Sequence, residues 1–428
     1  MEPIYKADSL SDFNRQRRVV VTGVGLISPL GVGTEPTWVG MLAGKSGIAA
    51  ITAFDASRFP CRIAGEVKGF RAEDFLERKD IKKTGRFIQF AIAAARAAVA
   101  QACLTSFKYD VERIGVYVGS GNGGFEIIER EHSRLLEAGP SRVSPFFVTA
   151  SIINLAAGQI GIRFGARGPN LACATACTSG AHAIGEAFRI IQYGDADLMI
   201  CGGTEAVISP LSIAGFAAMK ALSTRNDEAA QASRPWDKDR DGFVVGEGAG
   251  ILVLEERAHA LSRGARILAE LVGYARNSDA YHAATPPRDG DGILRVMKLA
   301  LKDAALPPCA IQYINAHATS TQLGDKAEAT AIATLFKDNR KTLAVSSTKS
   351  MTGHLLGAAG SLEAGITVLA LRDQIVPPTI NLVSTEVDYG LNLTPLTAKQ
   401  LDISYAMTNS FGFGGGNACL IFKAKSNL

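Results

Sequence analysis

Two segments rich in glycine and alanine constrain the fold of this 428-residue chain more than any other feature. They cover residues 179–193 and 357–371, and each follows an apolar, strand-like run and a polar turn. A helix built from such small residues has low intrinsic stability and little side-chain area, so it persists only when other layers pack against it on all sides. Two of them in corresponding places predict a duplicated fold around a central layer of helices.

Short apolar runs alternate with helical patterns along the rest of the chain, which predicts an α/β fold with both faces of each sheet covered. We expect strands at 18–25, 114–119, 171–176, 198–202 and 250–254, and then at 267–274, 313–316, 342–346, 403–408 and 418–422. The polar loop 277–291 is the best boundary. The predicted units are a polar leader over 1–17, a half over 18–276 and a half over 277–428.

The composition excludes several classes of protein. Glycine is frequent, with 44 residues, but proline, with 16, is not, so neither a fibrous nor a disordered chain is indicated. A net charge of +4 is too small to predict nucleic-acid binding, and no run of 18 apolar residues predicts a membrane span. The odd number of cysteines, seven, and the polar N-terminus favour a cytoplasmic protein without a disulfide framework.

Cys177 is the first candidate nucleophile, because a strand-like run ends there and a helical pattern begins. A thiol at a helix N-terminus lies at the positive end of the helix dipole beside free N–H groups, and both lower its pKa. A buried structural cysteine is the alternative. The neighbouring Cys173 stands at a spacing that fits no zinc knuckle.

Two of the six histidines follow segments where α/β folds place their ligands. His317 ends a predicted strand, and His354 follows a polar loop that contains Lys349. A third candidate is the glycine-rich loop 409–417, which either brings backbone N–H groups to a reacting carbonyl or is only a flexible turn. The early segment 23–25 lacks the later glycine of a dinucleotide fingerprint, so nucleotide binding is not indicated.

These segments resemble the β-ketoacyl-acyl-carrier-protein synthases, most closely the type II group. The similarity runs from Arg17 to Phe422 and is carried by residues 175–180, 240–243, 246–248, 315–321, 349–354 and 409–415. The resemblance implies a thiolase fold, with five αβαβα layers in two related halves, and a homodimer. It also implies decarboxylative Claisen condensation of malonyl-acyl-carrier-protein with an acyl chain, as in fatty acid elongation.

The resemblance also assigns roles to residues. Cys177 would carry the acyl chain, His317 and His354 would stabilise the enolate, and Lys349 would orient the site. The backbone N–H groups of Cys177 and Phe413 would hold the oxyanion, and Phe413 would gate the acyl pocket. The residues expected to bind substrate are Thr319, Thr321, Asn122, Phe147 and Phe411.

Further residues have expected supporting or docking roles, each with a structural alternative. Those expected to support the site, or merely to cap helices or form buried pairs, are Asp325, Glu328 and Glu363. Those expected to contact the acidic carrier protein, or to be ordinary solvated surface, are Lys82, Lys83, Arg142 and Lys220. No metal and no resident cofactor is expected, because 4′-phosphopantetheine arrives on the carrier.

Four positions depart from the usual family pattern. Asn122 stands where a bulky apolar residue is usual, Gln322 replaces a proline, and Ala284 and Gly416 replace threonines. Burying an unpaired amide costs about 1–3 kcal/mol, so Asn122 predicts an altered preference for acyl-chain length or polarity.

Three other functions stay open at this stage. The first is a condensing enzyme of a specialised polyketide or modified fatty acyl pathway. The second is a non-catalytic partner subunit that sets chain length, although the presence of Cys177 argues against it. The third is a zinc enzyme that uses Cys177, His317 and His354.

Overall fold

The computed structural model of the chain describes residues 17–104 and 110–425, so most of the predicted leader lies outside the described residues. Its main sheet has two halves. The first half contains, in order across the sheet, β6 (Asn170–Cys173), β5 (Ile114–Gly119), β7 (Leu198–Glu205), β8 (Gly248–Glu256) and β1 (Val19–Ser28). The second contains β9 (Ala269–Ser278), β15 (Gly416–Ala424), β14 (Tyr405–Phe411), β10 (Tyr313–Asn315) and β11 (Ala344–Ser346). β1 and β9 pair antiparallel and join the halves.

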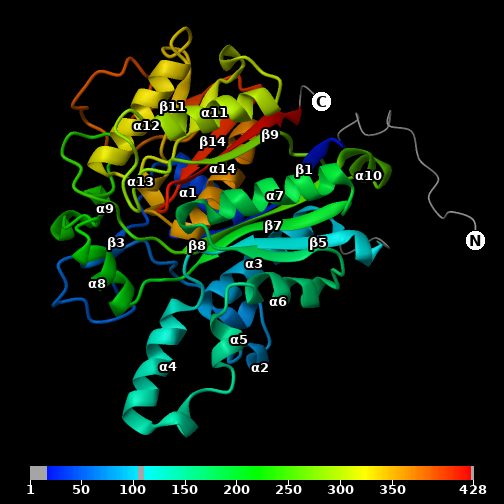
Figure 1. Cartoon of the computed structure of the whole chain (residues 1–428), viewed down its shortest axis with the longest axis vertical. Coiled ribbons are helices and arrows are strands. Elements are labelled where there is room, and N and C mark those ends of the chain that lie inside the picture. The colour runs from blue at the N-terminus through cyan, green and yellow to red at the C-terminus, as the bar shows by residue number, and fades with distance from the viewer. Residues whose placement is uncertain (1–16, 105–109, 426–428) are drawn as a thin grey trace, which may run out of the picture.

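Helices complete five layers, and the predicted αβαβα thiolase fold is confirmed (Figure 1). α3 (Arg86–Gln101) and α6 (Leu155–Phe164) cover the outer face of the first half. α11 (Asp291–Asp303) and α12 (Gln322–Leu335) form the outer layer on the second half, where α11 packs on β9 and β15. The remaining helices and short strands are α1 (Thr34–Leu42), α2 (Arg78–Ile81), α4 (Phe125–Ala138), α5 (Phe147–Ser151), α8 (Pro210–Ala218), α9 (Ala229–Ala232), α10 (Arg257–Ser262), α13 (Lys349–Thr352), β2 (Gly31–Val32), β3 (Ala49–Ala50), β4 (Ile63–Ala64), β12 (Ile375–Val376) and β13 (Lys399–Gln400).

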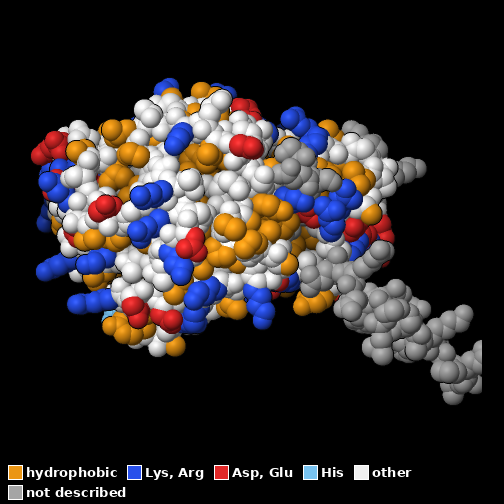
Figure 2. Space-filling model, turned by 90° about the horizontal axis from the view of Figure 1, so that it is seen from above, with side chains coloured by type: hydrophobic (Ala, Val, Ile, Leu, Met, Phe, Trp, Pro, Cys, Tyr) orange, Lys and Arg blue, Asp and Glu red, His pale blue; other side chains and the backbone are white. Residues whose placement is uncertain are grey.

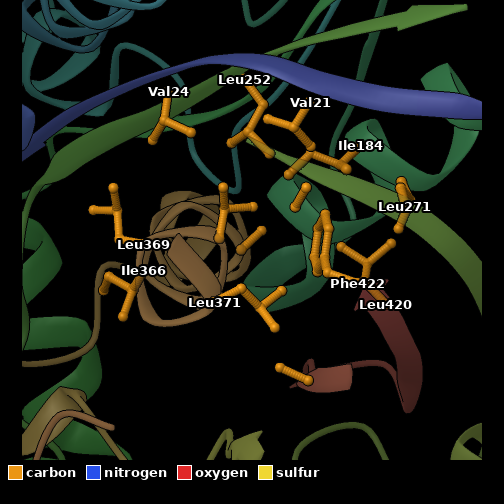
Figure 3. Packing of buried hydrophobic residues seen from close by; sticks show 14 of the residues in the cluster. Val21, Val24, Ile184, Leu252, Leu271, Ile366, Leu369, Leu371, Leu420 and Phe422 are labelled. Carbon is orange, nitrogen blue, oxygen red and sulfur yellow. The ribbon is translucent and has the colours of Figure 1, made fainter. Parts of the chain in front are cut away.

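The central layer consists of α7 (Ser179–Tyr193) and α14 (Ala359–Asp373), which lie between the two halves of the sheet. Every residue of α14 from Ala359 to Leu371 is buried. Figure 3 shows its Ile366, Leu369 and Leu371 packed among apolar side chains of both halves. The prediction that a small-residue helix needs neighbours on all sides is confirmed for α14.

Glycine is required where the two central helices meet. A Cβ atom on Gly180 would lie 2.8 Å from the Ser361 Oγ atom, and one on Gly360 would lie 2.8 Å from the Ala181 Cβ atom. Both distances are shorter than van der Waals contact, so no side chain fits between the helices at these positions. The starts of α7 and α14 can therefore approach each other.

Strand pairing bears on two expectations. β9 pairs with β15 from Ala269 to Ser278 and with β1 through its first residues, so it links the two halves of the sheet on the N-terminal side of the predicted boundary at residue 277. In addition, the segment predicted as a covered strand at 171–176 is the edge strand β6, with Leu171 45% exposed.

The surface and the helices also bear on what the composition predicts. Basic side chains are spread among apolar and other polar ones on the face shown in Figure 2. Within residues 17–104 and 110–425, no helix is long and apolar enough to cross a membrane.

The contact between α7 and α14 predicts different effects for two glycine substitutions. Gly180→Ala places a methyl group against Ser361 and is expected to lower the free energy of unfolding by about 1–3 kcal/mol. Gly215→Ala, in α8, meets no atom within 4 Å and is expected to be neutral or to stabilise by up to about 1 kcal/mol. Chemical unfolding of both variants measures the difference, and equal effects would contradict this account of the central layer.

Candidate active site

Cys177 lies in a one-turn 3-10 helix, η6 (Ala176–Thr178), between β6 and α7. Ala176 has a φ of +51°, a left-handed conformation that is strained for a residue with a side chain and marks a sharp turn before the cysteine. Cys177 is 8% exposed and lines a cavity of about 670 Å³. The predicted turn from strand to helix is therefore present, with the thiol at its tip.

The glycine-rich loop reaches Cys177 from the second half of the chain. The backbone N–H of Phe413 points toward the Cys177 thiol. A Cβ atom on Gly412 would lie 3.0 Å from the Thr175 carbonyl oxygen and 3.3 Å from the Cys177 nitrogen, so glycine permits this close approach. The N–H groups of Cys177 and Phe413 thus converge near the sulfur, where an acyl oxyanion would form.

The two predicted histidines face the same cavity. His317 follows β10 and His354 follows α13, and their ring centroids lie 5.2 Å apart with the rings nearly perpendicular. Aromatic rings support both: Phe411 lies 5.5 Å from His317, and Phe243 lies 5.5 Å from His354. The structure therefore brings both imidazoles to the cavity that holds Cys177.

Both imidazoles are neutral at physiological pH. Burial lowers the pKa of His317 and that of His354 well below the ordinary value, and the Lys349 charge lowers them further. Lys349 is itself buried and forms an ion pair with Glu363, whose pKa burial raises to about 7. A neutral imidazole keeps one N–H, so each histidine can donate one hydrogen bond.

Two further carboxyl groups hold the backbone around His317. Glu328 accepts hydrogen bonds from the N–H groups of His317 (3.0 Å) and Ala318 (2.7 Å), and burial raises its pKa to about 7. Asp325 accepts from the N–H groups of Ser320 (3.1 Å) and Thr321 (3.2 Å), and burial raises its pKa to about 6. Both side chains therefore act on the segment that carries His317 and the threonines after it.

The expected lowering of the thiol pKa is wrong for this cavity. Burial raises the pKa of Cys177 to about 12, and the charge of Glu205 acts in the same direction. The Phe413 N–H and the charge of Lys349 oppose this rise without outweighing it. The N-terminus of a helix favours a thiolate only where water still solvates the sulfur. Because Cys177 is buried, its sulfur has lost most of this water.

Most predicted substrate residues line the cavity, and some do not. Those that line it are Asn122, Thr319, Thr321, Phe411, Phe413, Lys220, Ala284 and Gln322. Phe147 and Lys82 line a separate cavity of about 280 Å³, and Lys83 lies over the Phe146 ring at 5.7 Å. Arg142 is exposed at the end of a short 3-10 helix. Gly416 is the first residue of β15, and a Cβ atom at this position would fit without a clash.

Several cavity residues had no predicted role. Phe243 belongs to the segment 240–243 that carried part of the resemblance, but its contact with His354 depends on folding. His282 lines the cavity, and its Nδ1 atom accepts hydrogen bonds from the N–H groups of Ala284 (3.1 Å) and Thr285 (3.2 Å). Leu356 has a φ of +46° in the turn η9 (Leu356–Ala358), which no sequence signal marked.

The described residues hold no group of three or more histidine, cysteine, aspartate or glutamate side chains placed to bind a metal ion.

Comparison with known proteins decides the family. Residues 16–260 match the family described as "Beta-ketoacyl synthase, N-terminal domain", and residues 268–383 match "Beta-ketoacyl synthase, C-terminal domain". The chain belongs to the β-ketoacyl synthase family.

Individual relatives agree with this assignment. The chain is 54% identical over 410 residues to the 3-oxoacyl-[acyl-carrier-protein] synthase 2 of Vibrio cholerae, covering 95% of this chain and 99% of that one. A solved β-ketoacyl synthase from Burkholderia phymatum is 37% identical, with a TM-score of 0.87 over 95% of this chain and 99% of that one. The predicted acyltransferase class and the condensing function in fatty acid elongation are confirmed.

A second similar structure is described as "type II PKS acyl-carrier protein in complex with its ketosynthase bound to the hexaketide". It is 35% identical, with a TM-score of 0.89 over 96% of this chain and 100% of that one.

The burial of Cys177 predicts how fast the free enzyme reacts with iodoacetamide. Because burial raises the thiol pKa to about 12, the rate is expected to keep increasing with pH beyond about pH 9. An ordinary thiol, with a pKa of about 8.5, would level off there. Cys177→Ser corrects for the other cysteines, and a plateau by about pH 10 would contradict the predicted direction.

Proposed function

We propose that this β-ketoacyl synthase holds an acyl chain on Cys177 and condenses it with malonyl-acyl-carrier-protein through His317 and His354. One observation carries the proposal: a thiol, two neutral imidazoles and the Phe413 N–H share one cavity, although they come from distant segments. The roles given to these residues by resemblance fit their placement.

The first half-reaction transfers the acyl group. The Cys177 sulfur, as thiolate, attacks the thioester carbonyl, and the N–H groups of Cys177 and Phe413 stabilise the resulting oxyanion. Collapse of this intermediate forms the acyl-cysteine and releases the carrier thiol, which takes the proton that Cys177 gave up. Since burial disfavours a resting thiolate, deprotonation belongs to the step in which the thioester enters.

The second half-reaction forms the carbon–carbon bond. When malonyl thioester loses carbon dioxide, the electron pair of the broken bond passes into an enolate. The N–H groups of His317 and His354 donate to its oxygen, which requires the neutral imidazoles described above. The enolate carbon then attacks the acyl-cysteine carbonyl, and collapse returns the Cys177 thiolate. Burial keeps both imidazoles neutral, and the charge of Lys349 adds to this effect.

We propose that the reactants arrive on an acyl carrier protein and that the chain has no resident cofactor or metal. Thr319 and Thr321 support this, because their hydroxyl groups lie 3.2 Å apart in the cavity, where a pantetheine arm could bind. Of the predicted carrier contacts, Lys220 is exposed at the cavity and Lys82 and Lys83 are exposed beside the α2–α3 turn. A similar solved structure is described with an acyl-carrier protein bound.

We also propose a homodimer and a cytoplasmic location. The edge strand β6 supports the dimer, since Asn170 and Leu171 are exposed and the free edge can pair with a second copy. The odd number of cysteines supports the location.

Removal of the nucleophile is expected to separate the two half-reactions. Cys177→Ala abolishes condensation but leaves decarboxylation of malonyl-carrier, because that step depends on the histidine pair. Further substitution of His317 by alanine lowers decarboxylation by about 100-fold. Carbon dioxide release and product formation measure the two steps, and full condensation by Cys177→Ala would contradict the mechanism.

The pH dependence of the remaining activity checks the state of the histidines. The decarboxylation rate of Cys177→Ala is expected to stay level between about pH 6 and pH 8, because both pKa values lie well below 6.5. A step in rate near about pH 6.5 would mean that an ordinary, titrating histidine takes part.

Asn122 predicts an altered substrate preference. Its backbone N–H donates to Glu205 at 3.1 Å, while the residue itself lines the cavity. Asn122→Ile is expected to favour unsubstituted acyl chains over oxygenated ones of equal length by about tenfold. Competition between carrier-bound acyl chains of graded length and polarity measures this, and an unchanged profile would remove Asn122 as a determinant.

A further inference from the structure

Glu205, at the end of β7, is fully buried and accepts four hydrogen bonds. The Oε1 atom accepts from the Ser120 hydroxyl (2.9 Å) and the Asn122 N–H (3.1 Å). The Oε2 atom accepts from the N–H groups of Gly121 (2.8 Å) and Gly357 (2.9 Å). One side chain therefore binds the loop 120–122 of the first half and the turn η9 of the second.

Four donated hydrogen bonds stabilise the ionised form of this carboxyl group, while burial acts against them and raises its pKa. Backbone N–H groups can only donate, and the Ser120 oxygen already accepts from the Gly123 N–H at 3.0 Å, which leaves its own hydrogen for Glu205. A protonated carboxyl would place a second hydrogen against one of these donors. No ion pair to Glu205 is found among residues 17–104 and 110–425, so donated hydrogen bonds alone stabilise the charge.

The three segments around Glu205 are in direct contact. A Cβ atom on Gly357 would lie 2.2 Å from the Gly121 nitrogen and 2.7 Å from the Glu205 Oε2 atom. A Cβ atom on Gly121 would lie 3.6 Å from the carbonyl oxygen of Ala176, the residue before the nucleophile. The carboxylate thus lies at a junction of loop, turn and nucleophile, without room for another side chain.

This junction forms part of the cavity wall. Asn122 and Leu356 both line the cavity, and each is next to a backbone N–H that donates to Glu205. Leu356, like Ala176 beside Cys177, adopts a left-handed conformation that its surroundings must maintain. Movement of the Glu205 carboxylate would therefore move two adjacent parts of the wall together.

We propose that Glu205 is a positioning residue of the condensation reaction, which holds the wall of the acyl cavity and the turn before Cys177 in place through four hydrogen bonds. The effect on the acyl cavity rests on the cavity being the proposed acyl site. The effect on the turn concerns the nucleophile alone and does not depend on the substrate.

Two variants and one control test the four hydrogen bonds of Glu205. Glu205→Gln removes the charge and leaves one acceptor oxygen for four donors. Glu205→Asp keeps the charge but is one methylene shorter, so it cannot reach all four. Glu66→Gln is the matched control, because Glu66 is 8% exposed and accepts from the Thr52 N–H (2.8 Å), the Thr52 hydroxyl (2.6 Å) and the Ala53 N–H (2.8 Å), away from the cavity.

Alkylation of Cys177 by iodoacetamide at one fixed pH tests the junction without the proposed substrates. Glu205→Gln and Glu205→Asp are both expected to change the rate by about tenfold, because Gly121 of the junction lies against the residue before the nucleophile, and Glu66→Gln is expected to leave the rate near the parent value. Parental rates in both Glu205 variants would overturn the effect on the turn before Cys177. This readout remains valid even if the proposed substrates are wrong.

Competition between acyl carriers of different chain length tests the geometry. Glu205→Gln and Glu205→Asp are both expected to change the ratio of long to short chains by about tenfold, and Glu66→Gln is expected to leave it unchanged. If both Glu205 variants lose only thermal stability and keep the parental ratio, the effect on the acyl cavity is overturned. Should Glu205→Gln fail to fold, Ser120→Ala removes a single donor, and a parental ratio in that variant also overturns it.

Discussion

The close approach of α7 and α14 is the contact on which the rest of the molecule depends. Glycine at positions 180 and 360 lets these two helices touch where their first turns meet. Cys177 lies just before one helix, and His354 lies just before the turn that leads into the other. A larger residue in this contact would push the two helices apart and move the Cys177 thiol away from the imidazoles. The packing of α7 against α14 therefore sets the separation between these groups.

Burial between the two sheet halves also determines the protonation of the site. Removal of water makes imidazolium and thiolate unfavourable, and it raises the pKa of Glu328 and of Glu363 to about 7. Each carboxyl group is stabilised by specific donors: backbone N–H groups for Glu328, an ammonium group for Glu363. Fixed N–H dipoles take the place of water in this site. Because water is excluded, these N–H groups stabilise an oxyanion or an enolate more strongly than they would in solution.

Local sequence signals predicted local features well. The bounds of α7 and β5 follow from apolar periodicity, because each element is one uninterrupted pattern that packs on the same neighbours along its length. Cys177, His317 and His354 were found because strand ends in α/β folds face the ligand. The direction of the Cys177 pKa shift and the role of Phe243 were missed, since both depend on segments far away in the sequence that enclose the site. Phe147 lines a different cavity for the same reason: its place depends on how α4 and α5 fold back, which no local pattern states.

The two ends of the main sheet differ in a way that bears on assembly. At one end, β11 is covered by the chain itself, because the Val345 N–H donates to the Asn392 carbonyl oxygen at 2.8 Å. At the other end, no strand within residues 17–104 and 110–425 pairs with the outer edge of β6. A molecule with one open edge and one blocked edge cannot add copies end to end. In the proposed homodimer, pairing through β6 would use the one open edge of each copy, so the assembly would stop at two subunits and would not grow into a fibre.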